Sequence, residues 1–248
     1  MPKRKSPFLF LAMKEGEFSM EELSEKLLEE LECRIAFEIP IFGGIPVPES
    51  CVVTWIIMAI LVILCRIFVR NLKTVPTGPQ LLVEMLIGWL NNFFLEIMGE
   101  KGKKFLPFLE TLIIYIAFSN LIGLIGLRPP TKDFNVTLGL SVMSIIYIQY
   151  CGIKKKGVKK WLKSFKEPVA LLLPINILEL VIRPLSLCMR LFGNVLGAFV
   201  VMELVKLCVP VGVPVILGLY FDIFDGLIQA YVFVFLSSLF LAEAIEDE

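Results

Sequence analysis

The chain has 248 residues, of which 57% are apolar, and its mean hydropathy is +0.81. Soluble domains are roughly 45–50% apolar, so we interpret the chain as a membrane protein with room for several spans of about 20 residues. The 24 basic and 24 acidic residues balance and give no indication of a nucleic-acid partner. Because histidine is absent and the six cysteines form no C-x-x-C pair, we predict no cofactor, metal site or disulfide framework.

Residues 1–37 are predicted to be an acidic amphipathic extension, and residues 38–248 a single membrane domain. A capping-box pattern at Ser19–Glu22 precedes an apolar stripe in the extension, which predicts a short amphipathic helix. The stripe consists of Leu23, Leu27, Leu31 and Ile35.

The membrane domain is predicted to be all-α, with about five membrane-embedded helices. The fourth would reach about 55 Å at about 1.5 Å per residue, against a hydrocarbon core of about 30 Å, so it must bend at Pro184 or tilt strongly. The fifth is predicted to return antiparallel to it. The five spans are residues 50–69, 105–127, 135–153, 168–206 and 212–242.

Residues 79–98 are predicted to form a further helix that carries Glu84 and Glu96 among apolar residues. Two interpretations stay open for it. The helix either anchors at the membrane surface or packs as a plain apolar helix on its neighbours or partners.

Basic residues predict the orientation. Seven lysines crowd residues 154–166, and six basic residues lie between 66 and 104, whereas the loop before the third span has only Arg128 and Lys132. Cytoplasmic loops carry the excess of Lys and Arg. We therefore expect a cytoplasmic C-terminus and an external N-terminus.

Arg190 is a cation inside an apolar stretch. Such a residue costs roughly 2.5–3.5 kcal/mol near the bilayer centre on insertion scales, which favours a functional positive charge, although an ion pair with a buried Glu is the alternative. On a helix, Glu179 and Asn194 lie on nearly the same face as Arg190, and Phe199 and Glu203 lie on roughly the opposite one.

Three polar residues share one side of the last span, at i, i+3 and i+7: Asp222, Asp225 and Gln229. Carboxylates within a membrane usually line a water-filled path or pair with a cation. The sequence therefore predicts an ion path here. The alternative is a set of structural hydrogen bonds to Arg183 or Arg190.

The runs Pro184-Leu-Ser-Leu and Arg190-Leu-Phe-Gly-Asn194, together with the loop at residues 130–137, resemble subunit a of the F-type ATP synthases over about residues 38–242. The resemblance implies a stator subunit in the cytoplasmic (inner) membrane of a bacterium, whose two half-channels carry protons or sodium ions to and from a rotor ring. It also implies that the last two helices form a long tilted hairpin that faces this ring. It implies that Arg190 is the coupling arginine and that Asn194 and Gln229 are the asparagine and glutamine of the family.

The sequence departs from the family at two places. Of the family's two titratable positions, one falls on Asp222 and the other on Phe199, which cannot ionise, and Glu203 is the candidate replacement, with packing beside Lys206 as its alternative. A carboxylate frequent in the family at the position of Asn176 is absent, and Glu179 stands nearby instead. Ion-path residues are thus predicted at Glu179, Asn194, Glu203, Asp222, Asp225 and Gln229.

The partners that the resemblance implies are the rotor-ring subunit c, the peripheral-stalk subunit b and membrane lipid. A secondary ion-coupled transporter is the competing hypothesis, and an assembly scaffold is a third. The sequence shows no inverted repeat of the kind many such transporters contain.

Overall fold

The computed structural model describes residues 35–39, 45–68, 78–125, 127–164, 173–208 and 212–246. These residues are mostly helical. The amphipathic helix predicted for the extension lies outside the described residues, except for Ile35 at its end.

A β-hairpin precedes the first span. β1 (Ile35–Ile39) pairs antiparallel with β2 (Ile45–Pro48), with an irregular register between Ile35 and Phe37. The helix prediction is therefore wrong at Ile35. Isoleucine favours strands, and pairing with β2 satisfies backbone groups that the end of a helix would leave open.

The first two helices are α3 (Glu49–Phe68) and α4 (Pro79–Met98). A proline at its first position favours the start of α4, and Gly99, with φ of 66°, follows its end. By length and apolar composition, six helical segments of the described residues could cross a membrane, namely the five predicted ones and α4.

The second and third spans are α5 and α6, joined by short 3-10 turns. α5 (Leu106–Leu121) lies between η1 (Glu100–Phe105) and η2 (Ile122–Ile125). η3 (Pro130–Lys132) then leads into α6 (Phe134–Lys156).

The ends of α6 are determined by local chemistry. The carboxylate of Asp133 caps its start by accepting a hydrogen bond from the backbone N–H of Asn135 at 2.9 Å. Lys154–Lys156 lie in its last turn, where cations interact favourably with the helix dipole. Gly157, with φ of 82°, ends α6 and precedes α7 (Val158–Ser164).

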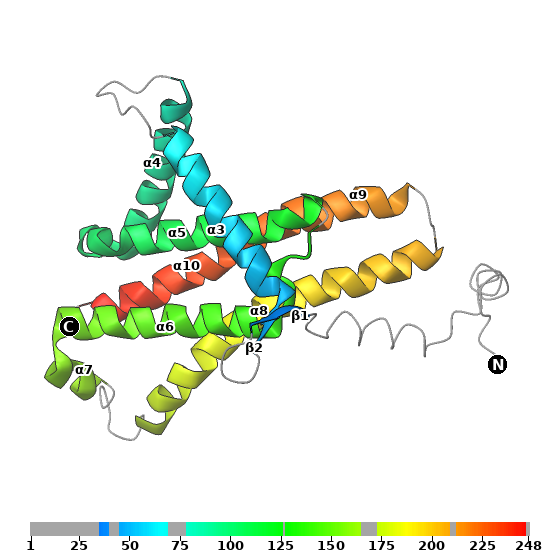
Figure 1. The fold of residues 1–248 in the computed structure, drawn as a ribbon. Coiled ribbons are helices and arrows are strands. Elements are labelled where there is room, and N and C mark those ends of the chain that lie inside the picture. The colour runs from blue at the N-terminus through cyan, green and yellow to red at the C-terminus, as the bar shows by residue number, and fades with distance from the viewer. Residues whose placement is uncertain are drawn as a thin grey trace, which may run out of the picture.

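The final two spans form a long pair. α8 (Leu173–Cys208) has 36 residues and contains Pro184, and at about 1.5 Å per residue it is about 54 Å long. It is bent in Figure 1, as expected of a helix with an internal proline. The return segment consists of α9 (Val213–Leu219), the π-helix η5 (Tyr220–Asp225) and α10 (Gly226–Ile245).

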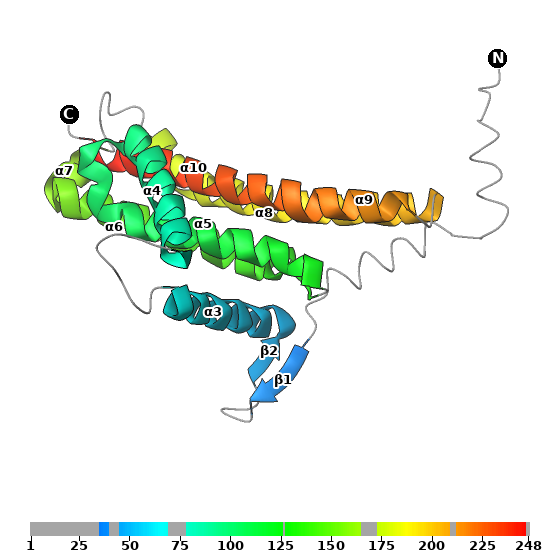
Figure 2. The ribbon, with the colours of Figure 1, turned by 90° about the horizontal axis from the view of Figure 1, so that it is seen from above.

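The helices pack in layers around α10, which contacts α4, α5, α6 and α8. Figure 2 shows α8, α9 and α10 in one layer, α5 and α6 in the next, and α3 beyond them. α4 contacts α5 and α10 and buries Leu90, Phe94 and Met98 in the core, which favours the packing interpretation of this helix. Other core residues are Leu109, Ile116, Ile148, Leu191, Phe233 and Leu241.

Candidate functional site

Arg190 lies on an exposed face of α8, and its guanidinium has no hydrogen-bond or ion-pair partner among the described residues. Gly193, Asn194 and Gly197 are exposed on the same face, at i+3, i+4 and i+7. A Cβ atom added at Gly193 or Gly197 would meet nothing within 4 Å. The helix surface beside the arginine is therefore open backbone, which lets another helix approach closely.

Gln229 of α10 holds the backbone of α8 at the level of Arg190. Its side-chain Nε2 donates to the carbonyl oxygen of Arg190 at 2.6 Å, and its Oε1 accepts from Nδ2 of Asn194 at 2.6 Å. Gln229 is only 2% exposed. The buried amide thus fixes the position of the turn that carries the arginine, without occupying the guanidinium.

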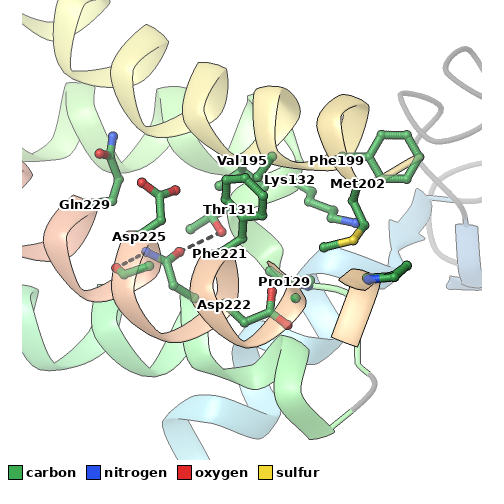
Figure 3. A pocket seen from close by; sticks show the side chains of 15 residues that line it. Pro129, Thr131, Lys132, Val195, Phe199, Met202, Phe221, Asp222, Asp225 and Gln229 are labelled. Atoms are coloured by element: carbon green, nitrogen blue, oxygen red, sulfur yellow. Dashed lines mark hydrogen bonds between the residues drawn. The ribbon is translucent and has the colours of Figure 1, made fainter. Parts of the chain in front are cut away.

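A cavity of about 500 Å³ lies between α8 and the η5–α10 segment (Figure 3). Gln229 lies at one end of it and Phe199 at the other, with Asp225 pointing into the space between them. The cavity therefore reaches the amide that binds the Arg190 carbonyl. Its polar lining residues are Asn120, Thr131, Lys132, Asp222, Asp225 and Gln229.

The π-helix η5 contributes both carboxylates of this cavity. Asp222 and Asp225 are half-buried and line it together with Gln229, as their spacing predicted. Single π turns inside α-helices are frequent at functional sites. Among the described residues, neither Arg183 nor Arg190 forms an ion pair with these carboxylates, so the alternative of hydrogen bonds to those arginines is wrong.

A buried amide connects the cavity wall across three segments. Thr131 Oγ1 donates to Asn120 Oδ1 at 2.9 Å, and Asn120 Nδ2 donates to the carbonyl oxygen of Gly226 at 2.8 Å. A Cβ atom at Gly226 would lie 3.0 Å from Asn120 Cβ. A side chain at position 226 would therefore require Asn120 to move by a few tenths of an ångström, so glycine favours this close approach of α5 and α10.

A second arginine of α8 has a different environment. Arg183 Nη2 lies 2.7 Å from Glu179 Oε2 and 2.8 Å from Glu243 Oε1, and the guanidinium stacks 4.9 Å from the ring centroid of Phe240. Glu179, predicted in the ion path, thus lies in an ion pair. It remains about half exposed, on the face that also exposes Arg190.

Phe199 and Glu203 are the two residues considered for the second titratable position of the family. Phe199 lines the cavity, away from the exposed arginine face, and the Lys132 ammonium lies 4.9 Å from its ring centroid. The side chains of Glu203 and Lys206 lie outside the described residues, so neither interpretation of Glu203 can be compared with the structure.

Sequence reasoning assigned no role in the site to Asn120, Thr131 and Lys132. The sequence does contain one indication for Asn120, because it is a polar residue inside an apolar span. The loop at residues 130–137 was noted only as a resemblance.

Comparison with known proteins places the chain in a family. The family model described as ATP synthase A chain matches residues 51–242. The chain belongs to this family. It is 35% identical over 209 residues to ATP synthase subunit a of Moorella thermoacetica, covering 84% of this chain and 95% of that protein.

Two further relatives have names that bear on function. ATP synthase subunit a of Geobacter sulfurreducens is 37% identical over 204 residues, which cover 80% of this chain and 88% of that protein. The sodium ion specific ATP synthase subunit a of Propionigenium modestum is 29% identical over 220 residues, covering 82% of this chain and 76% of that protein.

Family membership and six helices able to span a membrane make the chain a multi-pass membrane protein that works in a complex with other ATP synthase subunits. Its role is that of the ion-translocating stator subunit. No relative named here supports the secondary-transporter hypothesis.

Proposed function

We propose that the α8 face around Arg190 contacts the rotor-ring subunit c and that Arg190 is the coupling cation. The observation that carries this proposal is a guanidinium without a partner among the described residues, on a face opened by Gly193 and Gly197. An arginine inside a membrane is costly unless it is paired or hydrated. A carboxylate of another chain supplies that pairing.

Electrostatics explains what the arginine does to a rotor carboxylate. At about 4 Å and an effective dielectric constant of about 20, a guanidinium favours the carboxylate anion by roughly 4 kcal/mol. An arriving carboxylate therefore releases its ion. Because guanidinium stays protonated, it cannot pass a proton directly from one half-channel to the other, and transport is coupled to rotation.

The cavity is our candidate for one half-channel. Ions would pass Asp222 and Asp225 and reach the rotor beside Gln229 and Asn194. For Glu203, a role in this path stays a prediction from the sequence. The exposed carboxylate of Glu179 lies on the Arg190 face of α8, about three turns before Arg190, and we propose it for the other half-channel. The ion is H⁺ or Na⁺.

The orientation follows from α6. Its first residues adjoin η3, which lines the cavity, and its last turn carries Lys154–Lys156. The basic end is cytoplasmic by the positive-inside rule, so we propose that the cavity opens to the outside. With α4 packed on its neighbours rather than crossing the membrane, the other five spans place the N-terminus outside and the C-terminus in the cytoplasm, in a bacterial cytoplasmic membrane.

Cysteine labelling tests this orientation on a background that lacks the six native cysteines. A membrane-impermeant maleimide added to intact cells should label Leu127→Cys and leave Lys155→Cys unlabelled. The reverse pattern would overturn the orientation.

Exposed apolar faces fit the remaining partners. Leu82, Met85, Leu86 and Trp89 form an exposed stripe on α4, which we propose for the peripheral-stalk subunit b, whereas exposed side chains of α3 such as Val62 face lipid. A photoactivatable cross-linker on Met85→Cys should capture subunit b. Capture of lipid alone would contradict this assignment.

Cross-linking also tests the rotor contact. Ser186 is exposed one turn before Arg190, so a benzophenone on Ser186→Cys should capture the small ring-forming subunit, identified by mass spectrometry. The same group on Val62→Cys of α3 is the control and should not capture it. Equal capture from both positions, or from Val62→Cys alone, would contradict the proposal.

A further inference from the structure

The cavity contains a cation as well as two carboxylates. Among its described lining residues, Lys132 is the only one with a basic side chain, and it comes from the 3-10 turn η3 rather than from a span. Neither the coupling arginine nor the carboxylate path accounts for it.

The residues on both sides of Lys132 form side-chain hydrogen bonds to other helices, which hold η3 in place. On one side, Thr131 donates to Asn120 of α5 at 2.9 Å. On the other, Asp133 accepts a hydrogen bond from Ser50 of α3 at 2.6 Å and caps α6. A lysine held between two such contacts is positioned by the fold, because its stem cannot swing out with the loop.

The side chain of Lys132 points into the cavity. Its Nζ lies 4.9 Å from the centroid of the Phe199 ring, a distance suited to a cation–π contact. Figure 3 shows this amine beside Phe199 and Met202, with Asp225 toward the other end of the cavity and the Asp222 carboxylate turned toward Pro129. The ammonium thus enters the space to which those carboxylates would draw an external cation.

We propose that Lys132 is a specificity-determining residue that lowers the affinity of this cavity for alkali metal cations. A proton needs one carboxyl oxygen, whereas an alkali cation is held by several oxygen atoms that replace its water. A tethered ammonium competes for those oxygens at high effective concentration and repels a second cation. The inference rests on the proposed role of the cavity as an ion path.

The test uses the assembled ATP synthase in proteoliposomes. The Na⁺ concentration is varied in the compartment that supplies the driving ion, and ATP synthesis is measured. If protons drive the enzyme, Na⁺ competes with them, and if Na⁺ drives it, Na⁺ is the transported ion. In both cases the Na⁺ concentration with half-maximal effect reports the affinity of the path for Na⁺. The variants are Lys132→Gln and Lys132→Met, the latter retaining apolar contact with Phe199.

We expect this half-effect concentration to fall about tenfold in both variants, as for removal of one positive charge several ångströms away. Lys132→Arg, and Arg128→Gln as the control for surface charge on the same loop, should stay within about twofold of wild type. An unchanged Na⁺ dependence in either assembled lysine variant would overturn the proposal, and so would an equal fall in Arg128→Gln. Failure of wild type to synthesise ATP would instead count against the proposed function.

Discussion

Two arginines on α8 lie seven residues apart and have opposite environments. Arg183 binds Glu179 and Glu243 and stacks on Phe240, so its charge is neutralised within the chain. Arg190 has no such partner among the described residues, and Gln229 binds its backbone rather than its guanidinium. The comparison indicates that Arg183 joins α8 to α10, whereas Arg190 is left for another chain.

After Arg190 itself, the amide of Gln229 that supports it should show the largest effect. Gln229→Leu removes both hydrogen bonds to α8 and leaves the Asn194 amide without its acceptor, and net losses of this kind cost about 1–3 kcal/mol each. We expect ion-driven ATP synthesis to fall more than about tenfold, since about 1.4 kcal/mol corresponds to tenfold. Gln149→Leu, which loses a hydrogen bond from Trp161 far along α6, is the control, and an equal loss there would contradict the account.

The cavity wall should be less sensitive. Thr131→Val leaves Asn120 Oδ1 without its donor, and we expect ATP synthesis to fall about two- to fivefold, because the backbone bond from Asn120 to Gly226 remains. Thr111→Val is the matched control, since among the described residues the Thr111 hydroxyl binds only the carbonyl of Pro107 on its own helix. Full activity of assembled Thr131→Val would show that this contact does not shape the path.

Arg183 should matter least for transport, because its loss leaves in place the carboxylate of Glu179, which we propose for a half-channel. Arg183→Leu leaves two carboxylates without their cation, and because these are about half exposed, we expect a cost of about 1 kcal/mol, or about 2–4 °C in Tm. Synthesis should change less than about twofold. Adding Glu179→Gln and Glu243→Gln should restore Tm. Loss of synthesis equal to that of an Arg190 variant would remove the distinction between the two arginines.

Much of the fold could be predicted because its signals are local. Apolar runs and Pro-Pro or Gly breaks predict the spans, and helical spacing places Asp222, Asp225 and Gln229 on one side. The family motif directs attention to Arg190. The strand at Ile35 was missed because it depends on pairing with Pro48, thirteen positions further along the chain.

The rest of the site depends on contacts between distant residues. No residue type in Tyr220–Asp225 predicts the π turn found there. Arg183 binds Glu243, which lies 60 residues away in the sequence. In the sequence, Lys132 is one of two basic residues in a loop, and nothing there predicts a place in the site. Its place in the cavity follows from the bonds of Thr131 and Asp133 to α5 and α3, which only the tertiary structure brings together.

The most direct measurement compares Arg190→Lys with Arg183→Lys in assembled complexes, with subunit content verified by co-purification. A buried lysine can lose its proton and is a compact charge, so it replaces a guanidinium poorly. We predict that Arg190→Lys, like Arg190→Ala, abolishes ion-driven ATP synthesis, whereas Arg183→Lys retains more than about half of it, since an exposed ion pair is worth little. Near-wild-type synthesis by assembled Arg190→Lys would contradict the account.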